Sequence, residues 1–131
     1  MPIQDLKSNF PDTLANRKQV LTKALITMAS ILQLTQKELS EIIGLSTATF
    51  SRLFNNSSVL IDPKTKEGQL ALLLLRFYRS LDALFGGNAN QCCLWLRSNN
   101  KHLNGVPLDL IKSIEGLVFV IQYLDAMRGK N

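Results

Sequence analysis

The apolar residues of this chain recur every three or four positions over most of its length, which is the spacing of helices. The first such stretch predicts a long helix that Asp12 or Thr13 caps and that reaches about Leu32. Two short helices around a tight turn are predicted next, in LTQKELSEIIGLSTATFSRLF, before a loop from Asn55 to Leu60. No convincing strand pattern of alternating apolar and polar residues appears, so the sequence predicts an all-α fold.

The second half opens at Asp62-Pro63, because aspartate is a good helix cap and proline is tolerated in the first turn. The helix that follows stops at Gly86-Gly87 and is apolar on more than one side. Such a helix must be covered, so it is either buried on several sides or partly engaged in a homodimer interface. Three further helices are predicted after it: Ala89 to about Arg97, Pro107 through Ile111, and Ile114 to Met127.

The composition is that of a folded globular protein, with 46% hydrophobic and 19% charged residues among 131. The N-terminus lacks the basic-then-apolar order of a signal peptide, and the longest apolar run, Leu70 to Leu75, is too short to span a membrane. We therefore expect a cytoplasmic protein without membrane contact. The adjacent Cys92 and Cys93 cannot easily reach disulfide geometry, and we expect both to pack as small apolar residues.

The two short helices have the spacing of a helix-turn-helix. Thr35 and Glu38 form a capping-box pattern, so the first helix should begin at Gln36. Ser40 is small where the two helices cross, and Gly44 stands where the turn needs a residue that tolerates positive φ. The other interpretation is a generic helical hairpin that contains a glycine turn.

In a helix-turn-helix the second helix, here capped by Ser46, lies in the major groove of DNA. Phe50 and Leu53 are its inward positions and should belong to the core. Arg52 is the best candidate for a guanine or phosphate contact, although each outward residue can equally be an ordinary solvated one. With Gln36 from the first helix, the candidate DNA-binding residues are Gln36, Ser46, Thr47, Ala48, Ser51 and Arg52.

The net charge of +5 is unevenly distributed along the chain. Residues 1–62 hold six basic and five acidic side chains, whereas residues 63–131 hold nine basic and five acidic ones. The half with the helix-turn-helix is thus nearly neutral, and phosphate neutralisation supplies much of the affinity for DNA. We expect a single copy to bind DNA weakly and a homodimer to double the available contacts.

Two segments resemble known families. The helix upstream and the spacing of the helix-turn-helix resemble the Xre/Cro family of repressor domains. The stretch from Cys93 to Gly129, with the helix ending RFYRSLDALFGG before it, is similar to the toxin-binding domain of Xre/MbcA/ParS-type antitoxins. Asn100 stands where that family often has proline, which affects the stiffness of the loop. The residues that carry this resemblance are Trp95-Leu96, Asn99, Leu103, Gly105, Pro107, Leu110, Ser113, Glu115-Gly116, Val120, Leu124 and Gly129.

The resemblance implies an antitoxin of a type II toxin–antitoxin system. Its usual partner is a RES-domain toxin that degrades NAD⁺, and its C-terminal region occludes the active site of that toxin. The resemblance also implies a homodimer that binds its own operator DNA. The chain then divides into an Xre-like helix-turn-helix domain over residues 1–62 and a dimerisation and toxin-binding helical domain over residues 63–131.

The last helix is compatible with partner binding because apolar residues occupy two of its faces. One face, with Ile114, Leu117, Val118, Ile121 and Leu124, can close the domain while the residues beside it meet a partner. Trp95 is either an aromatic anchor or a core residue, and the polar tail either reaches into an active site or is a frayed terminus. The candidate toxin-binding residues are Trp95, Asn99, Val120, Tyr123, Met127, Arg128, Lys130 and Asn131.

The sequence gives no support for catalysis, so we expect a protein that is not an enzyme and that needs no cofactor or metal. The single histidine, His102, has no Cys/His set at metal spacing around it and no serine at a defensible spacing. No glycine-rich phosphate loop follows a strand. Two other functions stay open: a stand-alone Xre-type transcription regulator without a toxin, and a protein-interaction module whose helix-turn-helix has lost DNA binding.

Overall fold

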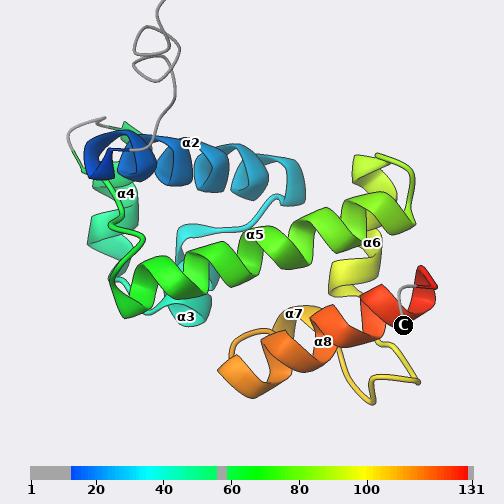
Figure 1. The fold of residues 1–131 in the computed structure, drawn as a ribbon. Helices are drawn as coiled ribbons and strands as arrows, with labels where there is room; N and C mark the ends of the chain where they lie inside the picture. Colours follow the sequence, from blue (N-terminus) through cyan, green and yellow to red (C-terminus); the bar gives the residue numbers. More distant parts are fainter. Residues whose placement is uncertain (1–12, 56–58, 130–131) are drawn as a thin grey trace, which may run out of the picture.

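The computed structural model describes residues 13–55 and 59–129, and within these ranges it contains α-helices and no strand (Figure 1). The predicted all-α fold is therefore confirmed. The helices in chain order are α2 (Leu14–Leu32), α3 (Gln36–Ile43), α4 (Thr47–Asn55), α5 (Lys66–Leu84), α6 (Ala89–Arg97), α7 (Pro107–Leu110) and α8 (Ile114–Met127).

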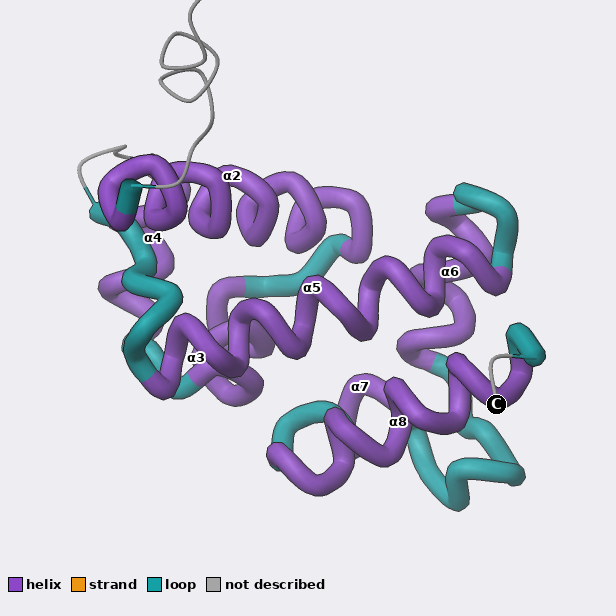
Figure 2. Tube along the Cα trace, viewed as in Figure 1, coloured by secondary structure: helices purple, strands orange, loops and turns teal. Residues whose placement is uncertain are grey.

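Helix α5 runs through the middle of the molecule and organises the fold (Figure 2). It packs against α2 on one side and α8 on the other, and its N-terminal part also contacts α3. The side chains of Leu74, Phe77 and Leu81 are fully buried in a single core that draws on residues from each of the helices named above. The predicted central helix is thus covered on several sides within one chain, and the helix-turn-helix and the C-terminal helices share its core.

The first helix begins at the predicted position. Of the two candidate caps, Thr13 takes the role, because its Oγ1 accepts a hydrogen bond from the backbone N–H of Asn16 at 3.2 Å. The helix ends at Gln33, which adopts the left-handed conformation with φ 56°. Asp12, the other candidate cap, lies outside the described residues.

The start of α5 differs from the prediction that Asp62 caps it. The cap is Thr65, whose Oγ1 accepts a hydrogen bond from the N–H of Gly68 at 3.0 Å. Asp62 instead closes the preceding turn by accepting a hydrogen bond from the N–H of Lys64 at 2.8 Å. That turn folds so tightly against the helix that a Cβ atom at Gly68 would overlap the Asp62 carbonyl oxygen. The tertiary turn, and not the Asp-Pro signal, therefore decides where α5 begins.

The C-terminal elements follow the sequence closely. Asn88 caps α6 through a 3.0 Å bond from the N–H of Gln91, and Ser113 caps α8 through a 3.0 Å bond from the N–H of Gly116. The side-chain oxygen of Asn100 holds the loop between α6 and α7, accepting from the N–H groups of His102 and Leu103 at 2.9 and 3.1 Å. Asparagine thus orders this loop by hydrogen bonds where proline would order it by its ring.

The two cysteines are free thiols on α6. Cys92 is fully buried, and the half-buried Cys93 lies with its Sγ 3.2 Å from the carbonyl oxygen of Ile31 at the end of α2. The prediction that they pack as small apolar residues is confirmed for Cys92. Among the described residues, no helix is both long enough and apolar enough to cross a membrane.

Candidate nucleic-acid and protein interfaces

Helix α3 has the N-terminus that the sequence predicts for the first helix of a helix-turn-helix. The Thr35 Oγ1 accepts from the N–H of Glu38 at 3.0 Å, and Glu38 Oε1 accepts from the N–H of Thr35 at 2.9 Å. Both bonds of the predicted capping box are thus present. The helix ends at Gly44, whose φ of 94° is the positive value expected for the turn.

Helix α4 packs on α3 in the predicted orientation. The Ser46 Oγ accepts from the N–H of Thr49 at 3.1 Å and so caps this helix. Phe50 and Leu53 are buried, at 0% and 2% exposure, and close the motif from the inside. The inward residues of the predicted helix-turn-helix are therefore confirmed as core.

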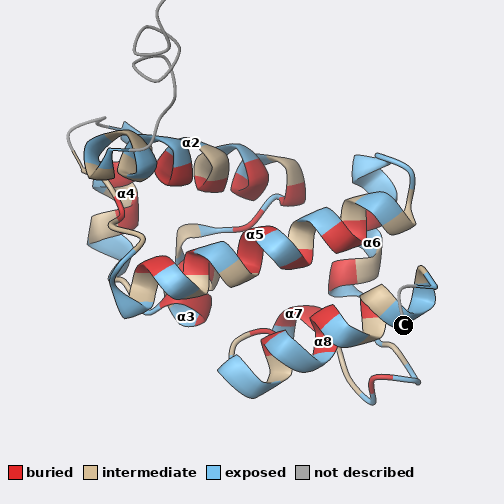
Figure 3. Ribbon diagram, in the orientation of Figure 1, coloured by how far each residue is buried: buried red, intermediate tan, exposed pale blue. Residues whose placement is uncertain are grey.

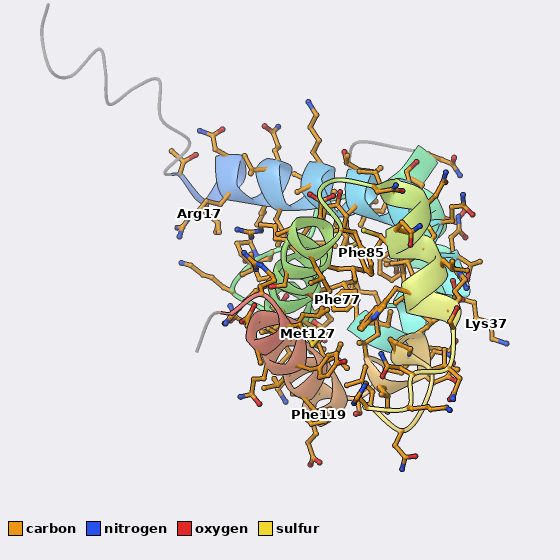
Figure 4. All side chains as sticks on the ribbon, turned by 90° about the vertical axis from the view of Figure 1, so that its right-hand side faces the viewer. Arg17, Lys37, Phe77, Phe85, Phe119 and Met127 are labelled. Atoms are coloured by element: carbon orange, nitrogen blue, oxygen red, sulfur yellow. The ribbon has the colours of Figure 1, made fainter. Side chains whose placement is uncertain are left out.

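The predicted DNA-contacting residues lie on the outer side of this motif. Ser46, Thr47, Ala48 and Arg52 are exposed, and Gln36 and Ser51 are half-buried. Within residues 13–55 and 59–129 the Arg52 guanidinium makes one long hydrogen bond, 3.5 Å to the Thr49 hydroxyl, and the side chain is exposed. The neighbouring Lys37 also points away from the molecule (Figure 4). Their contacts with DNA stay a prediction.

An ionic bridge joins α6 to the N-terminus of α3. The Nη1 of Arg97 lies 2.8 Å from Glu38 Oε2 and its Nη2 lies 2.9 Å from Glu38 Oε1, a two-pronged pairing. The same Nη2 donates to the Gln33 carbonyl oxygen at 2.8 Å. The hydrogen bonds from Arg97, together with the backbone N–H of Thr35 and the charge of Arg97, lower the pKa of Glu38 to about 2.

Sequence reasoning missed this bridge because its partners are 59 residues apart and each has a local explanation. Glu38 belongs to a capping box, and Arg97 stands in the last turn of a helix, where basic residues are common. A second contact of the same kind joins the segment before α8 to α3, since Lys112 Nζ lies 3.5 Å from Glu41 Oε1. The C-terminal half therefore contacts α3 near both of its ends.

The structure corrects the placement of Val120 on a partner-facing surface. Its side chain is fully buried, because Leu117, Val120, Ile121 and Leu124 form the side of α8 that packs on α5 (Figure 3). The sequence LVFVI over residues 117–121 is apolar throughout, so its pattern does not reveal which side of the helix faces inward. Ile114 and Val118, predicted on the closing face, are instead exposed at 61% and 37%.

Apolar side chains are also exposed along α8, spread over the outer half of the helix, opposite its buried side. Besides Ile114 and Val118 they include Met127, as predicted, and Phe119, which was not singled out; these two are 57% and 50% exposed. Phe119 points away from the molecule, whereas Phe77 of α5 lies between the helices (Figure 4). We call Ile114, Val118, Phe119 and Met127 the α8 stripe.

The other predicted partner-binding residues lie in different environments. Asn99 is exposed, and Trp95 and Tyr123 are half-buried against the core, so each ring keeps one part accessible. Arg128 is partly drawn inward, with Nη1 at 3.7 Å from Asp125 Oδ1 and 3.4 Å from Ser80 Oγ. Lys130 and Asn131 lie outside the described residues.

A groove of about 490 Å³ runs between α2 and α5 on another part of the surface. Val20 and Leu72, which line it, are exposed at 56% and 39%. Arg17, Lys64 and Arg79 also line the groove, which gives it basic edges. Apolar side chains exposed in this way are a common feature of surfaces that bind protein.

Comparison with family models assigns both halves of the chain. Residues 14–76 match the antitoxin Xre-like helix-turn-helix domain, and residues 80–130 match the antitoxin Xre/MbcA/ParS C-terminal toxin-binding domain. The boundary between the matched segments falls inside α5, the helix that packs against both α2 and α8. A search of curated proteins gave no match.

Proposed function

We propose, since this chain belongs to the Xre/MbcA/ParS antitoxin family, that it is the antitoxin of a type II toxin–antitoxin system. In this proposal it binds and neutralises a RES-domain toxin that degrades NAD⁺, and it represses its own operon through the helix-turn-helix. The observation that carries the proposal is the exposed α8 stripe on the segment that matches a toxin-binding domain. The protein acts in the cytoplasm, by binding and not by catalysis.

The α8 stripe is the proposed centre of the toxin-binding surface. Four apolar side chains on one helix offer the kind of anchor that binds a groove or a flat apolar patch on a partner. The proposed surface also includes Trp95, Asn99, Tyr123 and Arg128. A role of Lys130 and Asn131 in toxin binding stays a prediction from the sequence. Val120 supports the helix from inside and has no contact with the toxin.

Operator binding is proposed for the outer side of α4 and the N-terminus of α3. Arg52 reads a guanine or holds a phosphate, and Gln36 holds a phosphate at the first turn of α3. Residues 1–62 carry a net charge of only +1, so one copy neutralises few phosphates. The protein is therefore proposed to bind the operator as a homodimer that presents two helix-turn-helix motifs to the DNA. We place the contact between the two copies on the groove between α2 and α5.

Co-expression of the tagged chain with its flanking genes tests the toxin half of this proposal. A RES-domain protein should co-purify with the wild type, and Phe119→Asp should abolish the complex by placing a charge in its apolar centre. Ala89→Asp is the matched control, because Ala89 is exposed at the first turn of α6, where an acidic residue is tolerated. Absence of a RES-domain protein from the wild-type complex contradicts the toxin assignment.

A gel shift on the DNA upstream of the gene, at two salt concentrations, tests the repressor half. The wild type should bind more weakly at the higher salt concentration, and Arg52→Ala should weaken binding by about 1–3 kcal/mol. A shift without any toxin partner would identify a stand-alone Xre-family regulator instead. Absence of any shift would leave a protein-interaction module whose helix-turn-helix does not bind DNA.

A further inference from the structure

We propose that Arg97, a residue of the toxin-binding half, positions the helix-turn-helix and couples operator binding to the state of the C-terminal half. The inference rests on the proposed function for its operator and goes beyond it by assigning a regulatory contact. Arg97 touches neither DNA nor toxin in this proposal, since it acts through Glu38. It is a positioning residue.

The geometry of the Arg97 contacts fixes three elements relative to one another. Its guanidinium pairs with both carboxylate oxygens of Glu38 on α3 and donates to the carbonyl oxygen of Gln33, the last residue of the turn that ends α2. The planar fork of arginine can satisfy these acceptors together, whereas the single ammonium of lysine cannot do so in the same geometry. One side chain of α6 thus holds the junction between α2 and α3.

That junction lies at the N-terminus of the first helix of the DNA-binding motif. Glu38 receives Arg97 with the same carboxylate that completes the capping box with Thr35. Gln36, the candidate phosphate contact, lies in the same helical turn. Movement of α6 that breaks the bridge therefore removes a partner of the residue that caps α3, and the position of Gln36 changes with it.

A second ion pair also joins the C-terminal half to α3. Lys112 pairs with Glu41 near the other end of the helix, so the C-terminal half holds α3 at two points. Leu94, one turn before Arg97 on α6, is 63% exposed and offers an apolar contact next to the bridge. A protein that binds over α6 thus changes α3, and linkage requires that operator binding changes its affinity for that protein in return.

Hydrogen exchange on the full-length chain tests the positioning role without DNA. Arg97→Ala should speed amide exchange in α3 and α4 by roughly tenfold, and Arg97→Lys should have an intermediate effect. Arg76→Ala is the matched control, since Arg76 forms an exposed ion pair with Asp125 within the C-terminal half. Unchanged exchange in α3 in Arg97→Ala, or an equal increase in all helices, would overturn the positioning role.

Operator affinity measured on the same variants tests the coupling. Arg97→Ala should weaken operator binding by roughly tenfold, whereas Arg76→Ala should leave it unchanged. Faster exchange in α3 together with an unchanged operator affinity would overturn the coupling. If the wild type binds no operator, the repressor part of the proposed function fails, while the exchange result still decides whether Arg97 positions α3.

Discussion

The carboxylate of Glu38 makes one local and one long-range interaction, and both stabilise the folded protein. It caps α3 through Thr35 and receives the two-pronged pairing from Arg97. Both interactions favour the ionised form, and together they bring its pKa from 4.5 to about 2. A carboxyl group whose pKa is lower in the folded state stabilises that state above its unfolded pKa and loses this contribution as the pH falls.

The pH dependence of unfolding checks this role of Glu38. We expect Glu38→Gln to lower the free energy of unfolding above about pH 5, and the difference from the wild type to shrink between pH 4.5 and about 2. Urea unfolding across this range measures the effect. Asp109→Asn is the control, because Asp109 is largely exposed and should show a smaller change. A difference that does not depend on pH would contradict the ionic role.

At the scale of the element, short local signals decide where each helix begins and ends. Thr13, Thr35, Asn88 and Ser113 all accept a hydrogen bond from an N–H group three residues later. These bonds form within one turn, so neighbours in the sequence are sufficient to predict them. The start of α5 is the exception, because the turn from Asp62 to Thr65 packs against the helix that it introduces.

Gly44 offers a test of the turn between α3 and α4. We expect Gly44→Ala to lower the free energy of unfolding by about 1 kcal/mol, since alanine at a φ of 94° is strained while the site itself has space. Thermal or urea unfolding measures this loss. Gly105→Ala is the matched control, because its φ is not in the left-handed region and its new Cβ meets only ordinary contacts with Leu110. Equal losses at both positions would argue against strain at Gly44.

At the scale of the whole molecule, α5 makes the two halves into one body with a common core. Three of its surfaces are candidates for partner binding: the outer side of the helix-turn-helix, the α8 stripe and the groove between α2 and α5. The outer side of the helix-turn-helix is proposed to bind DNA, and the α8 stripe is proposed to bind the toxin. Their positions on separate helices allow one chain to bind both partners at once.

The groove between α2 and α5 is the proposed contact between two copies of the chain. We expect the wild type to be a homodimer and Val20→Asp or Leu72→Asp to make it monomeric, because each charge would enter the apolar contact. Light scattering after gel filtration measures the mass. Because basic residues line the groove, the dimer should tighten with salt, opposite to DNA binding. A monomeric wild type, or variants that stay dimeric, would rule out this interface.

The sequence by itself determined the features that depend on near neighbours: the all-α fold, most helix ends, the capping box of α3, the positive φ at Gly44 and the inward residues of α4. Its resemblance to two antitoxin domains was also sufficient to identify the family.

Only the tertiary structure decided which side of α8 is buried. It places Val120, predicted to face a partner, in the core, and it leaves Phe119 exposed on the surface. An apolar run of five residues has no preferred side until α5 covers one of them. The tertiary structure also brought Arg97 to Glu38, because a contact across 59 residues depends on how α2, α3 and α6 pack together. The spacing of residues along the sequence does not predict which distant helices pack together.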